Sequence, residues 1–167
     1  MEISIKSMVL LGAVILTGLS AGLFYAWSVS VIPGTKRVDD LTYLQTMQSI
    51  NRAILNPSFF LVFFGSGILM GVASIYEFQA GKLVFTMMTA GALCYLVGTV
   101  GVTGLGNVPL NNQLDTFNIA ESTTSQLAQF RETYERKWNK LHLIRTVFAV
   151  LSFGLAVMAL LIDSKKI

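Results

Sequence analysis

Three asparagines surround a proline at the end of a long uncharged segment of this chain. Residues 106–112 read Gly-Asn-Val-Pro-Leu-Asn-Asn, which places Asn107, Asn111 and Asn112 beside Pro109. Amide groups are costly to remove from water unless they form hydrogen bonds, so amides at the mouth of an apolar segment suggest a functional site. They could bind an oxygen atom of a ligand, or they could cap a helix end and tie the loops together. The sequence leaves both interpretations open.

A second polar group opens the last apolar segment. Trp138, His142 and Arg145 are four and three residues apart, so on a helix their side chains share one face. A histidine can exchange protons near neutral pH, an arginine can hold an oxyanion, and an indole ring offers a flat surface to an aromatic ligand. Alternatively, Arg145 reaches the membrane interface, Trp138 belongs to an interfacial aromatic belt, and His142 hydrogen-bonds a loop carbonyl.

Two further residues could complete the wall of a pocket. Trp27 lies at the corresponding end of the first apolar segment, and Asn51 lies beside Ile50 in the segment that follows. An aromatic belt at the membrane interface is the alternative interpretation of Trp27. Asn51 falls on the apolar side of its predicted helix, which favours an inward-facing role.

The elements that position these residues are membrane helices. The chain has 167 residues, of which 53% are hydrophobic and 13% are charged, whereas roughly a quarter of the residues of a soluble domain are charged. A helix needs about 20 mainly apolar residues to cross a bilayer. We therefore expect an all-α protein, a bundle of four transmembrane helices that forms one integral membrane domain over residues 1–167. The predicted spans are residues 8–32, 57–76, 83–105 and 141–162.

Two helical loop segments, residues 33–56 and 106–140, are expected to cap one side of the bundle. In the first, Asp39 or Asp40 can begin a helix, and Asn56 can cap the second span. In the second, Pro109 is expected to end the third helix. Thr123 or Thr124 can then begin a helix that runs directly into the fourth span.

The charge pattern indicates where the chain is located and what it binds. Its net charge is +3, but the basic residues flank apolar segments and are mixed with acids, which indicates a lipid bilayer and no nucleic acid as partner. We expect an integral protein of the cell (inner) membrane with cytoplasmic termini, although more lysines and arginines fall on the loop side. The sequence leaves open an aromatic small-molecule ligand and a homo-oligomer.

Metal chemistry is not expected. The chain has one histidine, and no carboxylate lies within a predicted span, so neither a di-iron bundle nor a zinc site can be assembled there. The single cysteine, Cys94, lies within the third span, where we expect a small core residue. We therefore expect no metal and no cofactor.

Several motifs, spread over most of the chain, together point to one family. They are Pro33-Gly34, Gln48-Ser-Ile-Asn51, Asn56-Pro57-x-Phe59, Thr103, Asn107-Val-Pro-Leu-Asn-Asn-x-Leu114 and Trp138-x-x-x-His142-x-x-Arg145-Thr146. In these motifs the chain resembles the anthrone-oxygenase-like family of small four-span membrane proteins, many of whose members are of unknown function. Fungal members of that family oxidise polyketide anthrones to anthraquinones without an obvious metal or flavin.

The resemblance implies a mechanism that needs no cofactor. An anthrone that loses a proton becomes an enolate, which can react directly with dioxygen, so the protein must supply a base, an oxyanion holder and an apolar aromatic slot. The alternative function is non-catalytic, namely binding of a quinone, a lipid or a partner protein. Under the resemblance, the catalytic candidates are His142 as base with Arg145 and Asn107 as oxyanion holders, and the substrate-binding candidates are Trp27, Asn51, Asn111, Asn112 and Trp138.

Overall fold

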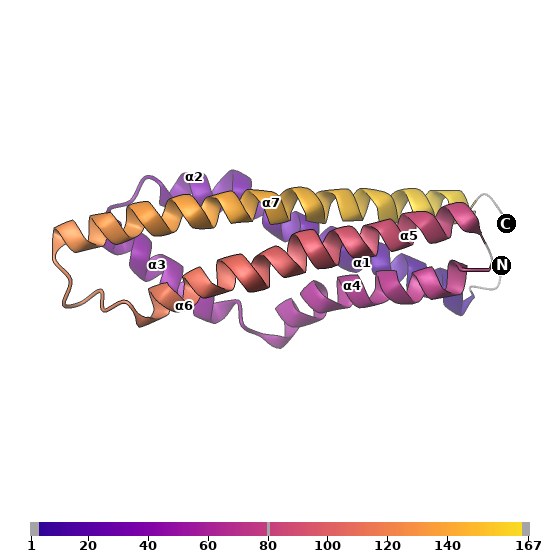
Figure 1. Cartoon of the computed structure of the whole chain (residues 1–167), viewed down its shortest axis with the longest axis horizontal. Helices are drawn as coiled ribbons and strands as arrows, with labels where there is room; N and C mark the ends of the chain where they lie inside the picture. Colours follow the sequence, from indigo (N-terminus) through magenta and orange to yellow (C-terminus); the bar gives the residue numbers. More distant parts are fainter. Residues whose placement is uncertain (1–3, 80, 165–167) are drawn as a thin grey trace.

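A computed structural model describes residues 4–79 and 81–164 of the chain, and this part contains helices joined by short turns and no strand. The structure has four long helical rods among these residues. Figure 1 shows the rods side by side, with the start of α1 and the end of α7 at one end of the bundle and α3 towards the other. Each rod contains a stretch long and apolar enough to cross a membrane. The predicted all-α bundle of four membrane-length helices is therefore confirmed.

The rods are longer than the predicted spans, and two of them change helix type along their length. π-Helical stretches, labelled η, interrupt the first and third rods. The first rod comprises α1 (Ile5–Ala26), η1 (Trp27–Val31) and α2 (Ile32–Thr35); α3 (Asp40–Ala53) and the second rod, α4 (Pro57–Glu77), follow. The third rod comprises α5 (Lys82–Cys94), η2 (Tyr95–Gly101), η3 (Thr103–Asn107) and α6 (Val108–Thr116), and the fourth is α7 (Thr124–Ser164).

The prediction that Pro109 ends the third helix is wrong, because α6 continues to Thr116. A proline lacks an N–H, and its ring clashes with the carbonyl four residues earlier in an α-helix. In both interrupted rods a π-helical stretch directly precedes the proline region: η1 precedes Pro33, and η3 precedes Pro109. The wider π turn makes room for the ring, so each helix continues past its proline.

The predicted helix starts on the loop side are confirmed. Asp39 accepts the backbone N–H of Thr42 at 2.9 Å before α3, and Asn56 accepts that of Phe59 at 3.0 Å before α4. α7 begins at Thr124 and runs without a break into the fourth span. Its 41 residues correspond to a length of about 60 Å, which is about twice the hydrocarbon thickness of a bilayer. α7 is therefore about twice as long as a membrane crossing requires, and both α3 and α6 pack against it.

A buried ionic cluster joins three rods at the end that carries the termini. Lys6 Nζ lies 2.8 Å from Glu77 Oε1 and donates a hydrogen bond to Asp163 Oδ1 at 3.0 Å. The contact with Glu77 is an ion pair by distance, without hydrogen-bond alignment. The Glu77 side chain is 1% exposed, so its charge depends on Lys6 for compensation. The cluster fixes α1, α4 and α7 at the end opposite the loop segments.

Candidate functional site

A cavity lies at the loop-side end of the bundle, where the sequence predicted a pocket. Its volume is about 90 Å³, enough for several waters, since one water needs roughly 10–15 Å³. Ligand pockets for drug-sized molecules are larger, roughly 300 Å³ or more. The cavity is lined by residues from all four rods and α3, namely Leu23, Phe24, Trp27, Ile50, Asn51, Ile54, Leu55, Phe59, Thr103, Val108, Asn111, Trp138, His142 and Arg145.

Arg145 is the most unusual of these residues, because it is a buried cation without an ionic partner. It is 8% exposed, and its Nη1 donates to Thr103 Oγ1 at 3.3 Å. The guanidinium carbon lies 4.7 Å from the ring centre of Phe24 and 5.0 Å from that of Trp138. No carboxylate pairs with it in the part of the chain that the structure describes. A guanidinium keeps its charge when buried, so this end of the cavity attracts an anion.

His142 holds the guanidinium of Arg145 in place. Arg145 Nε and Nη2 donate to His142 Nδ1 at 3.2 and 3.0 Å. Because a guanidinium can only donate, Nδ1 carries no proton and the ring is the neutral Nε2–H tautomer. Nε2 therefore donates to the carbonyl oxygen of Phe24, with 3.1 Å between the nitrogen and the oxygen, and it lies 3.0 Å from Ser28 Oγ. The one basic lone pair of His142 is thus occupied by Arg145.

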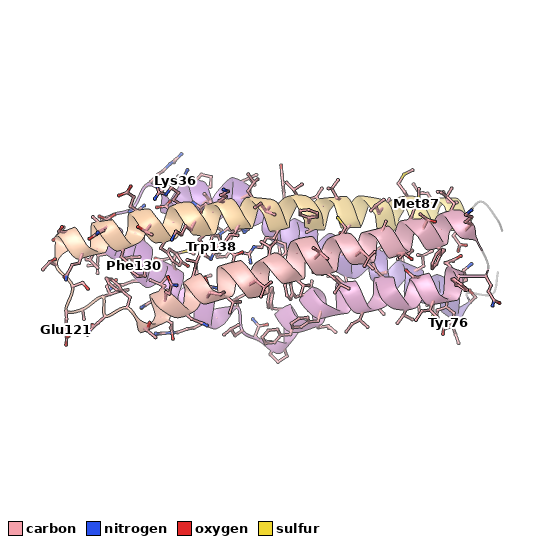
Figure 2. The ribbon with its side chains drawn as sticks, in the orientation of Figure 1. Lys36, Tyr76, Met87, Glu121, Phe130 and Trp138 are labelled. Atoms are coloured by element: carbon pink, nitrogen blue, oxygen red, sulfur yellow. The ribbon has the colours of Figure 1, made fainter. Side chains whose placement is uncertain are left out.

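Two indole rings form the aromatic wall. The ring of Trp138 is stacked on that of His142, with centroids 5.0 Å apart and planes 7° from parallel. The ring of Trp27 is tilted, with its centroid 5.8 Å from that of Trp138. Trp138, labelled in Figure 2, lies in the half of the molecule that carries α3 and α6, whereas the labelled Tyr76 lies near the chain ends. An aromatic ligand can pack against rings of this kind at the cavity.

A chain of hydrogen bonds fixes the amides beside this wall. Asn51 Nδ2 donates to Tyr134 Oη at 3.1 Å, and Tyr134 Oη donates to Asn111 Oδ1 at 3.2 Å. Trp138 Nε1 donates to the same oxygen at 2.8 Å. An indole N–H is only a donor, so the oxygen of Asn111 must face Trp138 and its amide NH₂ must point elsewhere. Among the described residues this NH₂ has no acceptor, which leaves it free to donate to a ligand.

The local folding of three helices explains why these side chains meet. On α7 the buried positions Trp138, His142 and Arg145 recur every three or four residues, so they form one stripe. On α1 the buried stripe ends with Ala21 and Phe24, and Trp27 follows one turn later at the start of η1. π-Helical segments are frequent at functional sites because they shift side chains relative to an α-helix.

The structure brings six of the eight predicted site residues to the cavity and leaves two outside it. The six are Trp27, Asn51, Asn111, Trp138, His142 and Arg145. Asn107 does not line the cavity: it is fully buried, and its Nδ2 donates to the backbone oxygen of Trp138 at 3.2 Å, which is a structural contact between η3 and α7. Asn112 is on the exposed side of α6, because it is one residue, and therefore about 100°, from Asn111.

Sequence reasoning missed several lining residues. Phe24 lines the cavity, and Tyr134 hydrogen-bonds the lining residues Asn51 and Asn111. Both carry a usable signal, since they precede Trp27 and Trp138 by three and four residues and share their helix faces. The aliphatic side chains of α3 and the α3–α4 turn carry no such signal, because their apolar pattern is that of any helix packed on a bundle. In the described ranges no three His, Cys, Asp or Glu residues group as metal ligands.

The family model described as "Anthrone oxygenase" matches residues 58–155, which is more than half of the chain. The match begins at the first turn of α4 and ends in α7, so it includes η3, α6 and the stripe of Trp138, His142 and Arg145. Searches of curated proteins and of solved structures found no match.

Proposed function

Since the chain belongs to the anthrone oxygenase family, we propose that it is an integral membrane oxygenase that oxidises an anthrone- or hydroquinone-like aromatic substrate at this cavity. The proposal needs no resident metal or flavin, because an electron-rich enolate can react with dioxygen directly. The family match and the four membrane-length helices support the class of protein. The residues at the cavity support the chemistry.

The observation that carries the proposal is the uncompensated charge of Arg145. A buried guanidinium surrounded by neutral groups stabilises a negative charge that develops beside it, and does so more strongly than in water. The free NH₂ of Asn111 supplies a second donor, while the rings of Trp27 and Trp138 supply the slot. The carbonyl oxygen of the substrate gains negative charge as it becomes an enolate oxygen. The site therefore binds this oxygen more strongly in the transition state than in the ground state, which accelerates the reaction.

The reaction balances with dioxygen as the only oxidant. Loss of one proton from the methylene carbon of an anthrone gives the enolate, whose negative charge rests on the oxygen beside Arg145. The methylene carbon transfers an electron to O₂ and then forms a C–O bond with the resulting superoxide. The peroxide takes up a proton, and loss of water from the hydroperoxide leaves a second carbonyl. One anthrone and one O₂ therefore yield one anthraquinone and one H₂O.

His142 is the base in this proposal, but its basic nitrogen must first be released by Arg145. Its Nδ1 can accept a proton only after Arg145 turns its N–H groups away. The forming enolate oxygen is a stronger acceptor than a neutral imidazole, so Arg145 moves to the substrate while Nδ1 takes the proton. Deprotonation of the substrate and release of the base are thus one coupled event.

A non-catalytic binding role is the second candidate, and two observations favour it. The cavity, about 90 Å³, does not enclose a three-ring substrate without movement of its walls. The occupied Nδ1 of His142 also fits a purely structural clamp on Arg145. Such a site would bind the oxygen of a quinone or a lipid without turnover.

Oxygen uptake by the purified protein in lipid nanodiscs, with anthrone as substrate, tests the proposal. We expect one O₂ consumed for each anthraquinone formed, measured with an oxygen electrode and by absorbance. Arg145→Met lowers kcat by about 100-fold or more, as expected for loss of an oxyanion donor. His142→Asn keeps an acceptor for Arg145 but has no proton-accepting nitrogen, so it also lowers kcat by about 100-fold or more.

Lys140→Ala is the matched control, because Lys140 is an exposed basic residue on the same helix. It leaves kcat unchanged. If the wild-type protein binds anthrone, detected as quenching of tryptophan fluorescence, yet consumes no oxygen, the binding role replaces the oxygenase. If His142→Asn keeps full activity while Arg145→Met loses it, His142 is a positioning residue and not the base.

A further inference from the structure

The cavity has a polar, closed end and an apolar, open end. Its most buried lining residues are Thr103, His142 and Arg145, together with the rings of Phe24 and Trp138. Its exposed lining residues are all aliphatic: Leu23 is 37% exposed, Leu55 65% and Val108 39%. The mouth of the cavity therefore lies between α1, the α3–α4 turn and α6, opposite the charged end.

The seam between α3 and α6 is closed on the water side of this mouth. Gln48 Nε2 donates to the backbone oxygen of Leu114 at 2.7 Å, and Arg52 Nε lies 2.6 Å from Asp115 Oδ1. Leu55 follows Arg52 by three residues and lies just past the end of α3. These contacts join α3 to the end of α6 that is remote from the membrane.

Four residues of the third rod, spaced about one turn apart, lead from this seam towards the bilayer. Leu114 belongs to the closed seam, Asn111 faces the cavity, Val108 borders the mouth, and Leu105 is 88% exposed. Beside Leu55, α4 likewise presents apolar side chains outward, with Leu61 66% exposed. Aliphatic side chains this exposed on a membrane-length helix face lipid. On the side towards water, the mouth is closed by the contacts between α3 and α6. On its other side, the mouth borders the lipid-facing side chains.

We propose that the mouth bordered by Leu23, Leu55 and Val108 is a lateral portal, through which a neutral, bilayer-dissolved aromatic compound with one ionisable oxygen enters from the membrane. This inference rests on the proposed function and names the route and class of its substrate. A neutral molecule passes the aliphatic rim without loss of hydration. It becomes an anion only at the closed end, beside Arg145.

The portal also accounts for the small cavity. A volume of about 90 Å³ receives the reacting edge of a ring system, while the remaining rings lie between the aliphatic side chains of the rim. Water-soluble, permanently charged aromatic compounds are therefore excluded as substrates, because their charge would have to cross the rim.

A spin label tests the orientation of the mouth without any measurement of activity. Cys94 is the one cysteine of the chain, so a Cys94→Ala background allows one label at Val108→Cys. In lipid nanodiscs we expect collisions of this label with O₂ to exceed those with a water-soluble nickel chelate, as at Leu105→Cys. A label at Gln113→Cys, on the exposed side of α6, shows the reverse. If the label at position 108 behaves like that at position 113, the mouth faces water and the portal is ruled out.

A plug tests the route itself. Val108→Trp narrows the mouth and lowers kcat/KM for anthrone by about tenfold or more, whereas Leu105→Trp, one turn away and outside the cavity, leaves it unchanged. Equal values for the two variants would overturn the portal even in an active enzyme. If the wild-type protein does not oxidise anthrone, the proposed function fails, and the spin label still decides whether the mouth opens to lipid.

Discussion

Gly98 is the position at which one added methyl group tests the packing that supports the site. A Cβ at this glycine would lie 2.0 Å from Cγ, 2.3 Å from Cδ1 and 2.5 Å from Cβ of Phe148. Rotation of the phenyl ring can relieve the first two contacts. The third cannot be relieved in this way, because Cβ is attached directly to the backbone of α7. Gly98→Ala therefore forces η2 and α7 apart by about 1 Å to restore an ordinary contact near 3.4 Å.

Overpacking of this kind costs about 1–3 kcal/mol, and we expect a loss of that size in the free energy of unfolding. The separation also reaches the candidate site, since Thr99 Oγ1, on the next residue of η2, donates to the backbone oxygen of Arg145 at 3.3 Å. SDS titration in mixed micelles, followed by circular dichroism, measures the change. Gly104→Ala is the matched control, because an added Cβ there meets nothing within 4 Å.

The double variant Gly98→Ala/Phe148→Ala separates the two sources of strain. Alanine at position 148 still has a Cβ, so the 2.5 Å contact persists and the double variant stays at least as destabilised as Gly98→Ala. Recovery of wild-type stability in the double variant would show that the ring was the obstacle and would refute the argument. So would a Gly98→Ala protein as stable as Gly104→Ala.

Two further predictions concern charged groups away from the cavity. Lys6→Met leaves the buried carboxylate of Glu77 uncompensated and lowers the free energy of unfolding by about 3 kcal/mol; equal stability of Lys6→Met and Lys82→Met, an exposed lysine on α5, would contradict this. The pKa of Asp39 is lowered because its carboxylate accepts the backbone N–H and the hydroxyl of Thr42. Its stabilisation of α3 is present above the ordinary carboxyl pKa of 3.8 and is lost as the pH falls through the lower folded value. We expect the difference in Tm between wild type and Asp39→Asn to shrink from about pH 6 to about pH 2, and a constant difference would show that ionisation is not involved.

The architecture could be read from the sequence because it depends on local patterns. Uncharged apolar runs of about 20 residues have few alternatives to membrane helices, and Asp39 and Asn56 act as helix caps through contacts within one turn. The shared face of Trp138, His142 and Arg145 follows from helical spacing alone. The course of the chain at Pro109 could not be read in this way, because a proline normally ends or kinks an α-helix, and the sequence does not show that the preceding turn widens into the π-helical stretch η3.

What the sequence by itself determined is the membrane bundle, the helix starts on the loop side and most of the residues that meet at one end. The tertiary structure decided which contacts each polar group makes, because the partner of such a side chain often lies on another helix and leaves no local signal in the sequence. Asn107 and Asn111 are the same residue type four positions apart, yet one binds the backbone of α7 and the other lines the cavity. The packing of the rods buries Arg145 against Thr103 and His142, with no carboxylate partner among the described residues. This uncompensated positive charge is the physical basis of the proposed site.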